Sequence, residues 1–550
     1  MQKRSVLICY SLLSGLLLWL SWYPTGWYFL GFVAWVPLFF ISDILLKGRG
    51  HRAFGQGILY SFPAFFLWNA ATTWWIWNST PAGAILAVVL NAFLMSVVFA
   101  LWHLFKAKEI FARWSPVFFI VLWCSWEYLH LHWQLSWPWL NLGNIFAPAT
   151  QIVQWYEFTG TFGGTIWLLA ANFLLYNALR KVIREKKATL SPFLYFILWI
   201  GIPVCGSLFY YFNYSCSKSY PVNAVVVQPN TDPWEEQYRM SNGAHARRLL
   251  GTASSYLTPR TELMVCPESA LPHNVGTLPL LRAEYKDTNL YENNPYKGFA
   301  VLDSFVSLYP QLNIVGGMSD GRLFDHAASR ASRQVDSGLY VEYYNSSFCL
   351  NTKGISGIYH KSRLVPGVEI MPYPSIFFFL KKLAEKFGGI TGTLGVDTIQ
   401  RTFLTTIHDR KLRIGVPICY ESIYGELFGQ FTLRGAGLMC IITNDAWWKE
   451  TPGHKQHFIY AKLRAVESRR TILRAANTGI SAIIDERGNV VQRTRYNEPS
   501  VLKATVFPNQ KITFYARYGD YLARMSLAVC GLLLASGCVK ILTSRKKSKL

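Results

Sequence analysis

The chain has 550 residues, of which 51% are apolar and 16% aromatic, and its formal net charge is +23. This length exceeds one ordinary domain, and the apolar share lies above the range usual for soluble proteins. The composition therefore excludes a single ordinary soluble domain and indicates a membrane component.

Seven apolar segments with almost no charge precede residue 215, most of them long enough to cross a bilayer as helices. They cover residues 5–23, 27–46, 57–78, 83–105, 117–131, 162–179 and 192–212, and an eighth covers 525–543. The fifth is short, and the adjoining LHLHWQLSWPWLNLGN is an alternative interfacial segment. The first resembles a signal peptide, but no small-residue cleavage site follows it, so we expect it to remain uncleaved.

The positive charge is concentrated beside alternate apolar segments. Residues 24–26, 79–82 and 132–161 contain no Lys or Arg. This is the positive-inside pattern, which places both termini in the cytoplasm. It also explains most of the excess charge, so no nucleic-acid partner is predicted. The cations are Lys3, Arg4, Lys47, Arg49, Arg52, Lys106, Lys108, Arg113, Arg180, Lys181, Arg184, Lys186, Lys187, Lys540, Arg545, Lys546, Lys547 and Lys549.

Residues 213–523 form a candidate globular domain between the seventh and eighth spans. With seven spans counted from a cytoplasmic N-terminus, this domain emerges outside the cytoplasm. Short β-branched runs alternate there with helical stretches such as residues 457–473, which predicts an α/β layered domain. The expected divisions are residues 1–212 for helices one to seven, 213–523 for the exported domain, and 524–550 for the last helix and a basic cytoplasmic tail.

Three short motifs place reactive side chains where predicted strands end. Glu268 lies in VCPESALP, Lys361 in YHKSRLVP and Cys419 in VPICYESIYG. Side chains at the carboxyl ends of strands in an α/β layer converge on a crevice. A thiol must lose its proton to attack a carbonyl. A carboxylate can take that proton, and an ammonium lowers the thiol pKa and stabilises an oxyanion.

Each of the three residues also has a purely structural interpretation. Glu268 before a helix-starting Ser269 is then a cap, Lys361 is a solvated side chain, and Cys419 is buried packing. Five of the ten cysteines lie in the exported domain, so at least one thiol there stays unpaired within the chain. His454 and His457 lack a third ligand nearby, so we predict no metal site.

The ordered motifs resemble the nitrilase (carbon–nitrogen hydrolase) superfamily and, joined to the apolar segments, the apolipoprotein N-acyltransferase family. The resemblance covers nearly the whole chain. It rests on SWPWLNLGN, QPNTDPWEEQY, CPESALP, YNSSFCL, YHKSRLVP, CYES, TNDAWW, RAANTGIS and TFYARYGD. It implies an αββα sandwich fused to an eight-helix transmembrane bundle in a 7+1 arrangement.

The resemblance assigns catalytic roles to Glu268 as general base, Lys361 as oxyanion partner and Cys419 as nucleophile. Supporting positions are Trp234 at a substrate entrance, Glu369 near the lysine, and Tyr420 and Glu421 beside the nucleophile. Trp234 as surface packing and Glu421 as a cap remain alternatives.

Two positions depart from the family pattern. Gly367-Val368-Glu369 stands where the family usually has a motif resembling Phe-Gly-Glu, and Cys266 stands where the family usually has a Trp. The first puts the role of Glu369 in doubt. The second alters the pocket wall or makes Cys266 an oxidation partner.

The implied reaction is transfer of a fatty acyl chain from a membrane phospholipid to the α-amino group of a lipoprotein's S-diacylglyceryl cysteine. It proceeds through a thioester on Cys419 and completes bacterial lipoprotein maturation. No cofactor is implied. The enzyme is expected as a monomer in the bacterial inner membrane, with its catalytic domain in the periplasm.

The apolar stretch at residues 372–389 combines an Ile-Phe-Phe-Phe-Leu run with three lysines, which is typical of an arm in the headgroup region. An ordinary amphipathic helix on the core is the alternative. Two rival functions also stay open. One is a membrane-anchored hydrolase of amides or nitriles. The other is a transporter or lipid-binding scaffold with an inactive domain. Charged residues within spans would support transport, and few are found: Asp43 near a span end, and Glu127 with His130 in the short fifth span.

Overall fold

The computed structural model describes residues 2–47, 52–186, 190–286, 290–374 and 392–547. The chain divides into two compact units, one of residues 1–77, 81–213 and 520–550, the other of residues 78–80 and 214–519. The predicted arm at 372–389 lies outside the described residues from position 375 onward.

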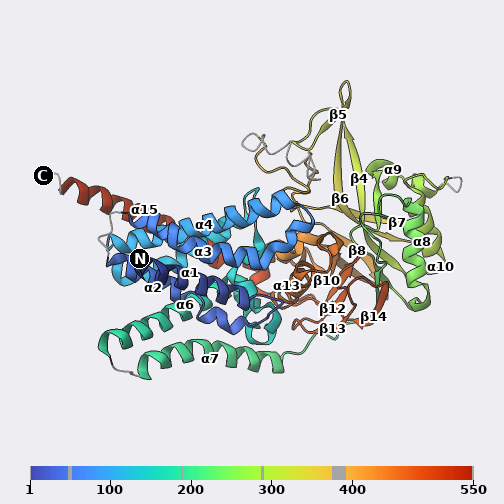
Figure 1. Ribbon diagram of the computed structural model, residues 1–550. Helices are drawn as coiled ribbons and strands as arrows, with labels where there is room; N and C mark the ends of the chain where they lie inside the picture. The colour runs from blue at the N-terminus through green and yellow to red at the C-terminus, as the bar shows by residue number, and fades with distance from the viewer. Residues whose placement is uncertain (1, 48–51, 187–189, 287–289, 375–391, 548–550) are drawn as a thin grey trace. The chain divides into compact units, whose positions relative to one another are not determined.

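The first unit is helical (Figure 1). Its helices are α1 (Gln2–Ser21), α2 (Val36–Leu46), α3 (Ala53–Thr73), α4 (Pro81–Ala107), α5 (Ser115–Leu131), α6 (Tyr156–Glu185), α7 (Leu190–Asn213) and α15 (Tyr521–Lys547). Each predicted apolar segment coincides with one of these helices or, for residues 27–46, with the short 3-10 helix Tyr28–Phe32 followed by α2.

Six helical segments among the described residues are long and apolar enough to cross a membrane. They are Arg4–Ser21, Tyr28–Leu46, Pro81–Ala107, Tyr156–Glu185, Leu190–Asn213 and Tyr521–Ile541. The other two predicted spans fall on α3 and on α5, which has 17 residues. The chain is therefore rich in membrane-length helices, and the count of eight spans stays a prediction.

The ionisable groups noted in or near the spans are bonded inside the first unit. Their partners are Lys106 for Asp43 at 2.8 Å, Thr165 for Glu127 at 2.8 Å, and Asn91 for His130 at 3.0 Å. Polar groups bonded in this way satisfy one another between helices. This arrangement favours a structural role for them over a transport path.

The second unit contains two β-sheets. The eight-stranded sheet consists of β1 (Val222–Gln228), β2 (Leu263–Val265), β3 (Leu271–Gly276), β4 (Asn313–Phe324), β5 (Arg333–Asp336), β6 (Leu339–Asn351), β7 (Gly354–His360) and β14 (Ser500–Val506). The six-stranded sheet consists of β8 (Thr402–Ile407), β9 (Arg410–Gly415), β10 (Ala436–Thr443), β11 (Ile472–Ala476), β12 (Ala482–Ile484) and β13 (Val490–Arg493).

The two sheets face each other, and helices cover their outer faces (Figure 1). The longest neighbour path in the first sheet is β14-β1-β2-β4-β6-β5, and the order in the second is β13-β12-β11-β10-β9-β8. Helices α8 (Asn242–Ala253) and α10 (Lys297–Leu308) pack on the first sheet, and α12 (Gly425–Leu433) and α13 (Pro452–Ser468) on the second. The shorter α9 (Thr277–Leu281) and α14 (Phe514–Tyr518) complete the unit. All eight residues of β10 are buried, as expected for a parallel strand covered on both faces.

Two local expectations were wrong. The helix expected at 457–473 ends at Ser468, because Arg469 adopts a left-handed conformation with φ 48° and the following Ile472 begins β11. No helix starts at Ser269, since the chain turns there and enters β3. Glu268 is therefore not a helix cap.

Gly317 on β4 lies directly against the backbone that carries Glu268. Its N–H donates to the Pro267 carbonyl at 2.9 Å, and a Cβ added at this glycine would lie 1.8 Å from the Glu268 carbonyl oxygen. Main-chain atoms this close cannot be cleared by rotating a side chain. The absence of a side chain at 317 therefore lets the loop after β2 rest on the sheet.

Replacing Gly317 with Ala should push this loop off β4 and destabilise the second unit by about 1–3 kcal/mol, the usual cost of overpacking. Gly251→Ala in α8 is the matched control, because no atom lies within 4 Å of its Cβ position. There Ala should stabilise the helix by up to ~1 kcal/mol. Thermal unfolding of the two purified variants checks the difference, and equal midpoints would contradict the packing argument.

Candidate active site

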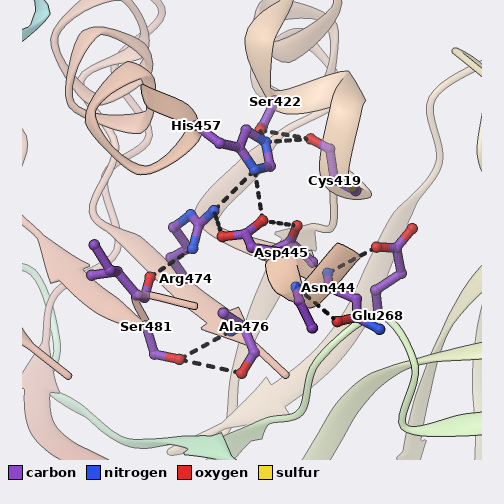
Figure 2. A network of polar contacts seen from close by, with 12 residues as sticks. Glu268, Cys419, Ser422, Asn444, Asp445, His457, Arg474, Ala476 and Ser481 are labelled. Atoms are coloured by element: carbon purple, nitrogen blue, oxygen red, sulfur yellow. Dashed lines mark hydrogen bonds and ion pairs between the residues drawn. The ribbon is translucent and has the colours of Figure 1, made fainter. Parts of the chain in front are cut away.

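Glu268 occupies the turn between β2 and β3, where its carboxylate is bound from both sides. Oε2 accepts the backbone N–H of Asn444 at 3.0 Å (Figure 2). Oε1 accepts the side-chain amide of Asn345 at 2.7 Å. Asn444 follows β10 of the other sheet, whereas Asn345 lies on β6. The acid is thus fixed between the two sheets.

Lys361 follows β7, and its ammonium is enclosed by two carboxylates. Nζ lies 3.2 Å from Glu268 Oε1 and 2.9 Å from Glu369 Oε1, and the side chain is only 1% exposed. Burial works to lower the pKa of Lys361, but Glu268, Glu369 and Cys419 more than offset it, so this pKa lies well above its usual value. The lysine is therefore a permanent buried cation and not a solvated side chain.

Cys419 begins a short 3-10 helix (Cys419–Ile423) after β9 and is 8% exposed. Its backbone has φ 50°, a left-handed conformation that a non-glycine residue keeps only where its surroundings hold it. Burial raises the thiol pKa well above its usual value, and Glu268 raises it further, whereas Lys361 lowers it. This environment favours the protonated thiol.

Glu421 connects the lysine segment with the nucleophile segment. Its Oε1 accepts the Ser362 N–H at 2.7 Å and the Tyr359 hydroxyl at 2.6 Å, and its Oε2 accepts the Ile418 N–H at 2.8 Å. Burial raises the pKa of Glu421 despite these donors. Glu421 caps the short helix and also fixes the residues next to Lys361 and Cys419.

The remaining predicted positions lie at different depths. Tyr420 is buried, and its ring packs edge-on against Tyr424 with centroids 5.3 Å apart. Trp234 is 54% exposed and packs edge-on against Trp447 at 4.9 Å. Glu369, placed in doubt by its altered loop, directly contacts Lys361.

Sequence reasoning missed Asn345, whose amide donates to both Glu268 at 2.7 Å and Glu369 at 2.8 Å. Asn345 lies in the motif YNSSFCL, but nothing in that motif alone indicates a catalytic role. The signal that could have found Asn345 is the β6–β7 hairpin, because its register places Asn345 beside Lys361. The Lys361 N–H donates to the Asn345 carbonyl at 2.8 Å. Asn444 was missed because it binds Glu268 through its backbone, which carries no residue-type signal.

All ten cysteines are free in the structure. Cys266, proposed as a possible oxidation partner, is buried, and burial raises its pKa to about 12. A thiol in that environment is a poor thiolate and packs as a small apolar side chain.

Two family models match the chain. One, described as carbon-nitrogen hydrolase, matches residues 224–510, and the other, described as the N-terminal domain of apolipoprotein N-acyltransferase, matches residues 14–174.

Relatives of the chain match along most of its length. An apolipoprotein N-acyltransferase of Chlorobaculum tepidum is 29% identical over 96% of both chains. One of Geobacter metallireducens is 26% identical over 98% of this chain and 95% of its own. Among solved structures, Saccharomyces cerevisiae Nit3 of the nitrilase superfamily matches 53% of this chain and 92% of its own, with 18% identity and a TM-score of 0.35.

Substitutions of Lys361 and Glu268 should move the pKa of the Cys419 thiol in opposite directions. Lys361→Met removes the charge that favours the thiolate, so the pH midpoint of Cys419 alkylation should rise. Glu268→Gln removes a charge that disfavours it, so the midpoint should fall, each by about one pH unit. Iodoacetamide labelling read by mass spectrometry checks both, with the half-buried Cys216 as internal control. Shifts of the same sign would contradict this electrostatic arrangement.

Proposed function

The chain belongs to the carbon–nitrogen hydrolase family, and from this premise we propose that it transfers a fatty acyl chain from a membrane phospholipid to a lipoprotein. The acceptor is the α-amino group of an N-terminal S-diacylglyceryl cysteine. Relatives named apolipoprotein N-acyltransferase and the matching N-terminal family model support this assignment over soluble amide chemistry.

The observation that carries the proposal is the buried Glu268–Lys361 pair, 3.2 Å apart, whose two charges shift the pKa of the Cys419 thiol in opposite directions. A base, a cation and a nucleophile held together are what acyl transfer through a covalent intermediate requires. Because the thiol pKa is raised, proton removal is coupled to attack on the substrate instead of preceding it.

In the first half-reaction Glu268 takes the thiol proton and Cys419 Sγ attacks an ester carbonyl of the phospholipid. Lys361 stabilises the oxyanion of the tetrahedral intermediate. The carbon–oxygen bond then breaks, the lysophospholipid alkoxide takes the proton from Glu268, and the acyl chain remains on Cys419 as a thioester.

In the second half-reaction the α-amino nitrogen of the acceptor attacks the thioester carbonyl. Glu268 accepts a proton from the amine, the carbon–sulfur bond breaks, and the thiolate leaves and regains that proton. The acceptor already carries lipid, which confines both substrates to one membrane and raises their effective concentration relative to free solution.

The membrane part of the proposal rests on the sequence pattern and on the membrane-length helices. Basic residues flank alternate spans, so eight spans place both termini in the cytoplasm and the catalytic unit on the opposite face. The enzyme then works as a monomer in the bacterial inner membrane, with its site in the periplasm. In this proposal Trp234 lies at the substrate entrance.

Cys419→Ala and Cys419→Ser should both fold and lose acyl transfer, because the alanine has no nucleophile and the serine hydroxyl is a far weaker one. A labelled diacylated lipopeptide in phospholipid vesicles provides the assay. Intact-mass measurement should find an acyl adduct on the wild type after incubation with phospholipid alone, absent from both variants. Cys216→Ser is the control that keeps activity. Normal turnover of the alanine variant would contradict the proposed role of Cys419 as the nucleophile.

Trp234→Ala should raise KM for the lipopeptide several-fold, because an exposed aromatic at an entrance contributes about 1 kcal/mol of contact. The pH midpoint of Cys419 alkylation should stay unchanged, since Trp234 carries no charge and is not among the groups that shift the pKa of the thiol. Tyr256→Ala, another partly exposed aromatic of the second unit, is the control. An unchanged KM would assign Trp234 to surface packing.

A further inference from the structure

A buried polar chain contacts the backbone of the proposed nucleophile. His457 on α13 lies with Nε2 3.1 Å from the Cys419 carbonyl oxygen and 3.0 Å from Ser422 Oγ. Ser422 Oγ donates to the same carbonyl at 2.7 Å. The carbonyl of Cys419 therefore lies against two donors (Figure 2).

The other ring nitrogen of His457 faces a buried ion pair. Nδ1 lies 2.9 Å from Asp445 Oδ1 and 3.0 Å from an Arg474 guanidinium nitrogen, which itself lies 2.8 Å from Asp445 Oδ2. Burial works to raise the pKa of Asp445, but Arg474 and His457 more than offset it, so the pKa lies far below its usual value. All three side chains are completely enclosed.

These contacts favour one placement of the ring hydrogen. Nε2 faces a carbonyl, which only accepts, and a hydroxyl that donates to that same carbonyl. Arg474, which can only donate, lies 3.0 Å from Nδ1, so the tautomer that these groups favour carries its hydrogen on Nε2. In that tautomer His457 donates to Cys419.

We propose that His457, oriented by Asp445 and Arg474, is a positioning residue that holds the Cys419 carbonyl and thereby the left-handed backbone that directs its thiol. The conformation at φ 50° is uncommon and needs support. Glu421 holds the backbone on the N-terminal side of Cys419 by accepting the Ile418 N–H. His457 and Ser422 hold it on the C-terminal side, at the Cys419 carbonyl. The inference rests on the proposed role of Cys419 as nucleophile.

Two amide substitutions separate positioning from general stability. His457→Gln places an amide N–H where Nε2 lies, and His457→Asn places one where Nδ1 lies, leaving the Cys419 carbonyl one donor short. His454→Gln, on the same helix with its ring stacked on Tyr496 at 4.4 Å, is the matched control.

The measurement is the single-turnover rate of thioester formation on Cys419, with phosphatidylethanolamine vesicles as acyl donor and the folded fraction determined in parallel. His457→Asn should be slower than wild type by about tenfold or more with KM unchanged, because the thiol is then less often held in its reactive orientation. His457→Gln should recover most of that rate, and His454→Gln should match wild type.

Equal rates for folded His457→Asn and wild type, or no difference between the two amide variants, would overturn the proposal. If neither variant accumulates, Ser422→Ala decides, because it removes the other donor to the same carbonyl: a slower thioester rate supports positioning and an unchanged rate overturns it. A wild type that forms no thioester would instead refute the proposed function.

Discussion

The buried ammonium of Lys361 is the constraint on which the site depends. Removing a cation from water costs several kcal/mol, and the structure offsets that cost with two carboxylates, Glu268 and Glu369, each also bonded by Asn345. Loss of Lys361 leaves two neighbouring carboxylates without their shared counter-charge. Burial, with the Glu268 carboxylate second, raises the pKa of the Cys419 thiol by more than the Lys361 ammonium lowers it.

The site is assembled from both sheets. The eight-stranded sheet supplies Glu268 after β2, Asn345 on β6 and Lys361 after β7, whereas the six-stranded sheet supplies Cys419 after β9. Glu421 connects the segment that carries Lys361 with the segment that carries Cys419, because its carboxylate accepts the backbone N–H groups of both Ser362 and Ile418. The distances between acid, cation and thiol are therefore set by how the sheets pack and not by any one loop.

Sequence reasoning reached the parts that local chemistry determines. The apolar segments coincide with helices, and the runs of β-branched residues coincide with β1, β2, β4 and β10, because burial on both faces requires such runs. It failed where tertiary context decides. The end of α13 depends on a left-handed Arg469 that no helix propensity reveals. Asn345 required the hairpin register, and the contact of His457 with Cys419 joins residues 38 apart in the chain.

The eight-stranded sheet is complete only when β14, its last strand in chain order, is present. β1 pairs antiparallel with β14, so residues 222–228 find this neighbour only when residues 500–506 are present. During synthesis the acid and the lysine leave the ribosome long before that closing strand, and domains generally fold as units. An unfinished chain that lacks β14 therefore leaves β1 without this neighbour at the edge of the sheet. We expect the arrangement of Glu268, Lys361 and Cys419 to become fixed only when nearly the whole second unit has been synthesised, so that completion of the fold and completion of the site coincide.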